Sequence, residues 1–159
     1  WLVSILLNLV GGYLSLLGLV GLYARHSAQS GRLGLVAFVL ASLGTSFYIG
    51  YLWAGAFVVP HLTEVAPEFL DLVDRNPSGL IAVGFISTFL SFSLGWALMG
   101  YATTRAQLVS RLAGWSLVAG SIVNLILGGA GLPLGAVLFG LALAWLGWSL
   151  WSETEMASM

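Results

Sequence analysis

Residues 1–24 read WLVSILLNLVGGYLSLLGLVGLYA, and the first charged side chain follows only at Arg25. At about 1.5 Å per residue, a helix over this stretch is roughly 36 Å long, which is enough to cross a bilayer core about 30 Å thick. Residues 33–59 contain no charged side chain either. Both stretches are therefore typical of transmembrane helices.

The composition of the whole chain points the same way. Of 159 residues, 59% are hydrophobic and only 7% are charged, and the mean hydropathy is +1.00. A soluble domain has roughly 25% charged residues, because its surface faces water. We therefore expect the outer surface of this protein to face lipid.

Three further apolar segments complete the predicted topology. A single helix over residues 112–151 would be about 60 Å long and overshoot the bilayer, but Gly128 to Pro133 contain the glycines and proline of a tight turn. The sequence thus predicts an all-α integral membrane bundle. We expect one domain over residues 1–159, with spans at about 1–24, 33–59, 80–104, 112–127 and 134–151.

The charged residues between the spans predict an orientation. Four of the five arginines fall in loops 25–32 and 105–111, namely Arg25, Arg32, Arg105 and Arg111. Loop 60–79 is acidic, with Glu64, Glu68, Asp71 and Asp74 against Arg75. The positive-inside rule places the two basic loops and the C-terminus in the cytoplasm of a bacterial inner membrane, and loop 60–79 outside. Because this puts Trp1 outside, we also expect an upstream helix, although a processed or short preceding segment is the alternative.

The acidic outer loop carries two predictions. From Pro67 onward, Phe69, Leu70, Leu72 and Val73 alternate with polar residues, which predicts a short amphipathic helix in the membrane interface. The same loop also contains four weak candidates for a metal site, which lie three or four residues apart: His61, Glu64, Glu68 and Asp71. Pro67 interrupts their register, so we interpret the set as a solvated acidic face and predict no metal.

Small residues recur at helical spacing on the last three segments. The three predicted stripes are Ser87, Ser91 and Gly95; Gly120, Asn124 and Gly128; and Ala136, Gly140 and Ala144. Such stripes let helices approach closely in lipid, so we predict helix packing within the bundle, with a homo-oligomer or partner interface as the alternative. Most of the tryptophans, Trp96 among them, are interpreted as an interfacial aromatic belt.

Little in the spans suggests chemistry. They contain no Asp, Glu, His, Lys or Arg, side chains that ion- or proton-coupled transport usually needs. Asn8 and Asn124 are interpreted as interhelical hydrogen-bonding groups, or alternatively as the lining of a small polar site. His26 and His61 lie at opposite membrane faces and cannot ligate one haem together, although a single pigment on either is conceivable. The chain has no cysteine and no basic run, so disulfides, thiolate metal sites and nucleic-acid binding are not expected.

Several apolar stretches resemble small multi-pass bacterial membrane proteins of actinobacterial and Chloroflexi type, a group with no established activity. The matching stretches are GLVGLYAR (18–25), GRLGLV (31–36), AFVVP (56–60), APEFLD (66–71) and LALAWLG (141–147). The resemblance implies a six-span bundle, which would supply the expected upstream helix, and it implies no functional residue.

These observations favour a non-catalytic membrane subunit or accessory protein that packs against other membrane components. We expect no enzymatic activity and no cofactor. The partners expected are the bilayer, other membrane subunits or a second copy of the chain. The alternative is an uncoupled transporter or channel for a small neutral or apolar solute, with a path near Asn8, Asn124 and the Ser87–Ser91 face. The third hypothesis is an outer-face metal-binding protein or enzyme that uses His61 and the acidic loop.

Overall fold

The computed structural model describes residues 2–69, 78–107, 110–129 and 134–157. Within these ranges the chain is helical, with no strand. The elements are α1 (Leu2–Val65), a 3-10 turn η1 (Pro67–Phe69), α2 (Gly79–Arg105), α3 (Arg111–Gly129) and α4 (Leu134–Ala157). The prediction of an all-α fold is confirmed.

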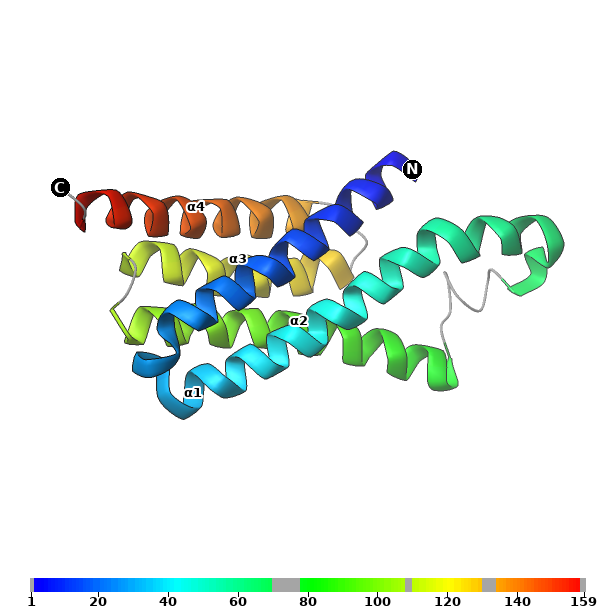
Figure 1. The fold of residues 1–159 in the computed structure, drawn as a ribbon. Helices are drawn as coiled ribbons and strands as arrows, with labels where there is room; N and C mark the ends of the chain where they lie inside the picture. Colours follow the sequence, from blue (N-terminus) through cyan, green and yellow to red (C-terminus); the bar gives the residue numbers. More distant parts are fainter. Residues whose placement is uncertain (1, 70–77, 108–109, 130–133, 158–159) are drawn as a thin grey trace.

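Helix α1 consists of two arms that form a hairpin at Gly31 (Figure 1). Gly31 has φ 53° and ψ −147°, a backbone conformation that glycine adopts without the steric penalty of a side chain. Next to the bend, the rings of Tyr23 and Phe38 stack with their centroids 4.3 Å apart. We call residues 2–25 the first arm of α1 and residues 32–65 its second arm.

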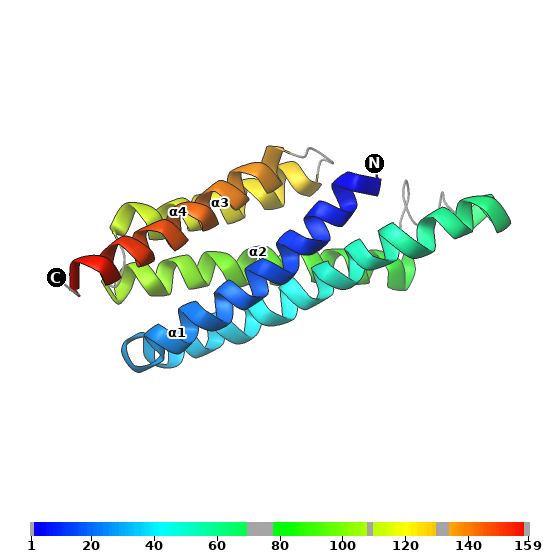
Figure 2. The same ribbon diagram turned by 45° about the horizontal axis from the view of Figure 1, so that its top comes forward.

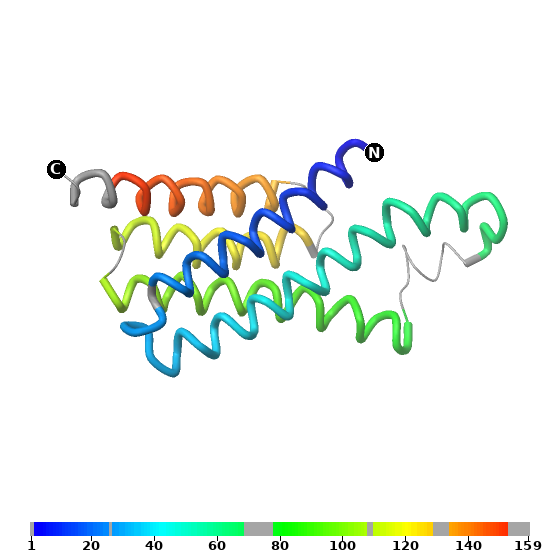
Figure 3. The backbone as a smooth tube through the Cα atoms, in the orientation of Figure 1, coloured from blue at the N-terminus to red at the C-terminus, as the bar shows by residue number. Residues whose placement is uncertain are grey.

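Five helical segments are long and apolar enough to cross a membrane: Leu2–Arg25, Ser27–Val65, Gly79–Arg105, Arg111–Gly128 and Leu134–Ser152. This agrees with the predicted number of spans. Figure 3 shows that successive segments alternate in direction. The Gly31 hairpin, the end of α2, the start of α3 and the end of α4 lie at one end of the bundle, called the arginine end. The start of α1, η1, the end of α3 and the start of α4 lie at the other, called the η1 end.

The bounds of two helices differ from the prediction. Helix α1 continues through Pro60 to Val65, where a loop was expected. Just beyond the proline, the Thr63 hydroxyl donates to the carbonyls of Val59 and Pro60 in its own helix. Helix α4 extends beyond Trp151 to Ala157. The predicted amphipathic helix is not confirmed, because only its first residues are described, as η1, and residues 70–77 lie outside the described part.

Glycines bring the second arm of α1 and α2 into backbone contact. A Cβ atom on Gly44 would collide with the backbone of Phe92, and one on Gly95 would collide with the backbone of Ala41. Each helix therefore places a glycine where the other helix crosses it. This reciprocal arrangement is the close approach that small residues permit between helices in lipid.

The same principle joins the next two pairs of helices. A Cβ on Gly100 of α2 would lie 2.8 Å from the carbonyl oxygen of Gly114 on α3. A Cβ on Gly120 of α3 would lie 3.3 Å from the Cα atom of Phe139 on α4. Helices α2, α3 and α4 therefore pack in chain order, and Figure 2 shows α3 and α4 side by side.

Trp96 belongs to the core and not to the predicted aromatic belt. It lies in the middle of α2, its side chain is 1% exposed, and its Nε1 donates to the Thr45 hydroxyl at 3.0 Å. The Thr45 hydroxyl in turn donates to the carbonyl of Ala41 at 2.6 Å. The sequence interpretation was wrong for this tryptophan because its indole N–H finds a partner inside the bundle, away from the interface.

Candidate functional site

A groove lies between the first arm of α1 and helix α4. It consists of two adjoining cavities, of about 260 Å³ and 480 Å³, which share Gly11, Ser15, Gly140 and Leu143 as lining residues. We call the whole the α1–α4 groove, the smaller cavity its polar part and the larger its apolar part. The first arm crosses in front of α3 in Figure 1. It is the least buried of the five spans: 11% of its 18-residue apolar window is buried, against 22–33% in the other four.

Glycines, which have no side chain, leave the space of this groove open. A Cβ atom on Gly11, Gly18, Gly140 or Gly147 would meet no neighbouring atom within 4 Å. The predicted stripes therefore lie in different surroundings: Gly120 packs on α4, whereas Gly140 and Ala144 line the groove. Ala136 lines its polar part.

Aromatic residues of α2 and α4 lie beneath the groove. Phe92 and Phe139 line the polar part and Trp96 lines the apolar part. The ring centroid of Phe139 lies 5.1 Å from that of Phe92 and 5.5 Å from that of Trp96, both edge-on. Because these rings are buried and in mutual contact, they give the groove a firm apolar floor.

Asn124 is the decisive residue of the polar part. Its side chain is 9% exposed, lines the cavity and makes no hydrogen bond within the described part of the protein. Gly135 leaves room for it, since a Cβ there would lie 3.2 Å from Asn124 Oδ1. Of the described side chains, the Ser42 and Ser93 hydroxyls are fully enclosed without a partner. The Asn124 amide instead reaches the cavity, so it can form hydrogen bonds with a group placed there.

The other polar groups of the cavity are partly used. Asn8 lines it from the first arm, and its Nδ2 donates to the carbonyl of Ser4 at 2.8 Å. The Ser15 hydroxyl donates to the carbonyl of Gly11 at 2.8 Å. Tyr48 also lines the cavity, from the second arm. The structure thus brings Asn8 and Asn124, predicted as a possible polar pair, to one cavity.

Charged side chains lie at the ends of the bundle and not in the groove. None lines either cavity among the described residues. At the arginine end, Arg32 and Arg105 line a separate cavity of about 330 Å³ below the Gly31 hairpin. Arg25 lies at the end of the first arm and Arg111 opens α3, so the four predicted arginines share one end.

The serine face of α2 does not reach the groove. Ser87 and Ser91 are absent from its lining, and each hydroxyl is bonded to its own helix. The Ser87 hydroxyl donates to the carbonyl of Gly84 at 3.0 Å, and the Ser91 hydroxyl donates to that of Ser87 at 2.6 Å. Of the residues predicted to line a solute path, only Asn8 and Asn124 therefore line the groove.

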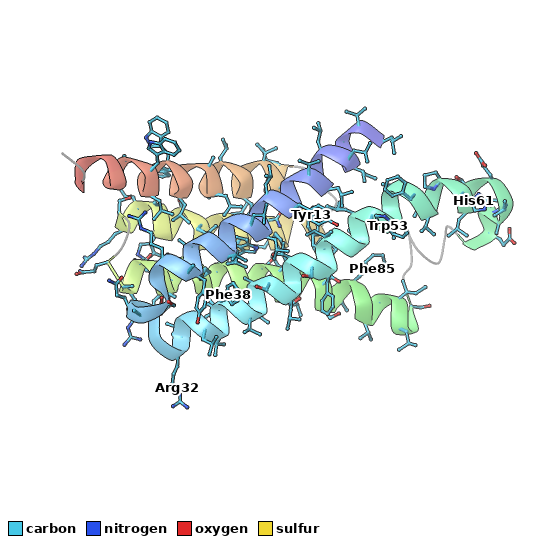
Figure 4. The ribbon with its side chains drawn as sticks, in the orientation of Figure 1. Tyr13, Arg32, Phe38, Trp53, His61 and Phe85 are labelled. Carbon is cyan, nitrogen blue, oxygen red and sulfur yellow. The ribbon has the colours of Figure 1, made fainter. Side chains whose placement is uncertain are left out.

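The weak metal candidates lie at the η1 end. His61 and Glu64 are exposed on the last turns of α1, and Glu68 is exposed on η1; Figure 4 shows His61 far from Arg32. Across residues 2–69, 78–107, 110–129 and 134–157, no group of three His, Cys, Asp or Glu side chains could hold a metal ion. Asp71, the fourth candidate, lies outside the described residues.

Comparison with protein-family models, with curated proteins and with solved structures finds no match to this chain. The resemblance to small multi-pass bacterial proteins therefore stays a prediction. The sequence interpretation identified Asn8, Asn124 and the α4 stripe, but it missed the small residues of the first arm that line the groove. The spacing of Gly11, Ser15 and Gly18 could have indicated them, because it resembles the small-residue pattern of the later segments.

Proposed function

We propose that this chain is a non-catalytic integral membrane protein that holds another membrane component in the α1–α4 groove. The observation that carries the proposal is an open groove at whose polar end a buried Asn124 amide has no partner among the described residues. Among the described residues that line the groove there is no carboxylate, histidine, lysine or arginine, and Tyr48 contributes a phenol. A binding role, as an accessory protein, therefore fits this site better than acid–base or nucleophilic chemistry.

The orientation is part of the proposal. We place the arginine end in the cytoplasm of a bacterial inner membrane, because four arginines gather there and positive charge is retained inside. Because the chain has no cysteine, single cysteines at exposed Gln29 and Glu64 report the two ends directly. A membrane-impermeant maleimide added to intact spheroplasts should label E64C and spare Q29C. The reverse labelling would overturn the orientation.

Photocrosslinking in native membranes tests the binding role. A benzoylphenylalanine at Gly140 projects into the groove, whereas one at Trp145, roughly 140° around α4 and 46% exposed, projects away from it. We expect a discrete adduct from Gly140 and only diffuse labelling from Trp145. Equal labelling at the two positions would reject the groove as a binding site.

A carrier for a small neutral solute is the second candidate. It is favoured by the two asparagines, which line one cavity from opposite helices. Proteoliposomes of the purified chain should then take up glycerol or urea faster than protein-free liposomes, and Gly140→Leu, which fills the groove, should abolish the difference. Uptake that is unchanged by Gly140→Leu would reject the groove as a path.

A further inference from the structure

We infer that the α1–α4 groove binds a neutral lipid with a single long hydrocarbon chain in the groove and a hydroxyl or carbonyl head at Asn124. The inference rests on the proposed binding role and names the chemical class of the bound component. It follows from the polarity of the two parts of the groove, from their depth and from their size.

The polar part fixes the head of the ligand. The Asn124 amide offers two N–H donors and one carbonyl acceptor, and none of them has a partner in the described residues. Asn8 faces the same cavity from the first arm. A hydroxyl or carbonyl group placed here would satisfy Asn124 in a medium where an unpaired amide is unfavourable.

The absence of charge around the described groove fixes the class of head. An anionic or cationic head in the polar part would lose water without gaining a counter-charge, since no charged side chain lines it. Such burial is strongly unfavourable within a membrane. A neutral head meets no such penalty, so the groove selects against phosphate and ammonium groups at this depth.

The apolar part fixes the tail. Asn8 and Asn124 lie within about 9 Å of the η1 end, counting residues along their helices. From Asn8 to Leu22 the groove follows the first arm for about 21 Å toward the arginine end, past Trp96 and Leu150. One leaflet of hydrocarbon is about 15 Å deep, so a chain whose head sits at the asparagines has room to extend to the bilayer centre. The volume of 480 Å³ lies in the range of small-molecule sites, roughly 300–1,000 Å³.

The same volume argues against a transmembrane helix as the occupant. The space of the apolar part, with its open side counted, is about 970 Å³. A helix about 10 Å across fills roughly 400 Å³ per 5.4 Å turn, and a spanning helix has between five and six turns. The apolar part would therefore hold about two turns of such a helix, whereas a single hydrocarbon chain can follow its length.

Native mass spectrometry of the purified full chain tests the inference. The probes are 1-oleoylglycerol, which is neutral, and oleoyl-lysophosphatidylglycerol, which has the same tail and a charged head. We expect a one-to-one adduct with 1-oleoylglycerol and binding at least about tenfold weaker for the charged lipid. Asn124→Leu should weaken 1-oleoylglycerol binding about two- to tenfold, and Asn124→Gln, which keeps the amide, should retain most of it.

Two glycine variants provide the matched pair. Gly140→Leu fills the groove and should reduce 1-oleoylglycerol binding by about tenfold or more. Gly50→Leu adds the same side chain to an exposed helix position with nothing within 4 Å, and it should leave binding unchanged. Equal loss in both variants would mean that lipid binds the general apolar surface, and the inference would fall.

The remaining outcomes separate the two proposals. Equal binding of the charged lipid, or binding unaffected by both Asn124→Leu and Gly140→Leu, overturns the lipid inference alone. A protein adduct at the Gly140 photoprobe, without a lipid adduct in either experiment, also overturns the lipid inference but keeps the binding role. Failure of the Gly140 probe to exceed the Trp145 control overturns the binding role itself.

Discussion

Two sets of glycines in this bundle occupy opposite surroundings. On the closed side, Gly44 and Gly95 lie where the second arm of α1 crosses α2, and any side chain there would collide with backbone. On the open side, Gly11 and Gly140 both line the α1–α4 groove, and a Cβ on either would touch nothing within 4 Å. Glycine thus permits close helix contact on one side of the bundle and leaves open space on the other.

The difference shows where the helices pack closely and where they leave space between them. The closed side links the second arm of α1, α2, α3 and α4 through successive backbone approaches, which bring many atoms into van der Waals contact. The open side leaves the first arm as the least buried span. A rigid scaffold with one open flank is an arrangement suited to binding, because the pocket is pre-formed while access stays lateral.

Leucine substitutions at the two sets should produce the largest contrast. Gly95→Leu inserts a side chain into backbone contact, and overpacking of this kind destabilises by about 1–3 kcal/mol or more. We expect a loss of about 3 kcal/mol or failure to fold. Unfolding by SDS titration in mild detergent, followed by circular dichroism, measures it.

Gly140→Leu is the control for that experiment, since it makes the same change on the open side. Its stability should stay within about 0.5 kcal/mol of the original chain, as for surface substitutions. If the two variants were equally destabilised, the distinction between the closed and open sides would be wrong.

Gly135→Ala should have the next largest effect, because it changes the rim of the groove. The added Cβ would lie 2.9 Å from Asn124 Cα and 3.3 Å from Leu127 Cβ, so α3 and α4 must separate slightly. We expect a loss of roughly 1–2 kcal/mol in the same titration. Gly140→Ala, on the same helix and free of contacts, should not be destabilised; a similar loss there would point to a general effect of removing glycines.

The sequence predicted the helical class, the number of spans and the gathering of four arginines at one end. These features depend on apolar length and on charge between segments, which are local properties of the chain. It did not predict the course of α1 through Pro60. Proline breaks most helices, so a loop was predicted from residue 60 onward. The bonds of the Thr63 hydroxyl to carbonyls of its own helix could not be foreseen from the sequence.

The site was predicted only in part, for a physical reason. Small-residue spacing is the same at Gly95, which packs, and at Gly140, which lines the groove. Gly95 meets Ala41 of the second arm, whereas Gly140 meets no neighbour. Both outcomes depend on how helices distant in sequence cross, which is a property of non-local packing. Trp96 shows the same limitation: its burial depends on Thr45, 51 residues away in the chain.

A smaller effect is expected from the buried hydrogen bond of the closed side. Thr45→Val removes the acceptor for Trp96 Nε1 while keeping the volume of the side chain, so the indole N–H is left buried and unpaired. Interhelical hydrogen bonds in membrane proteins contribute about 0.6–1.7 kcal/mol, and we expect a loss of about 1 kcal/mol. Thr63→Val, whose hydroxyl bonds only to its own helix at an exposed position, is the control and should change stability by less than half as much.

Asn124→Leu should have the smallest effect on stability and so complete the contrast between the two sides. The Trp96–Thr45 pair of the closed side is hydrogen-bonded, whereas the Asn124 amide lines the cavity without a partner among the described residues. Replacing an unpaired buried amide by an apolar group of similar size is nearly neutral or stabilising. We expect a change between zero and about 0.5 kcal/mol of added stability in lipid-free detergent. When 1-oleoylglycerol is added, the original chain should gain stability and the variant should gain less, because a ligand stabilises only the state that binds it. A loss near 1 kcal/mol without lipid would show that Asn124 supports the fold and is not held open for a ligand.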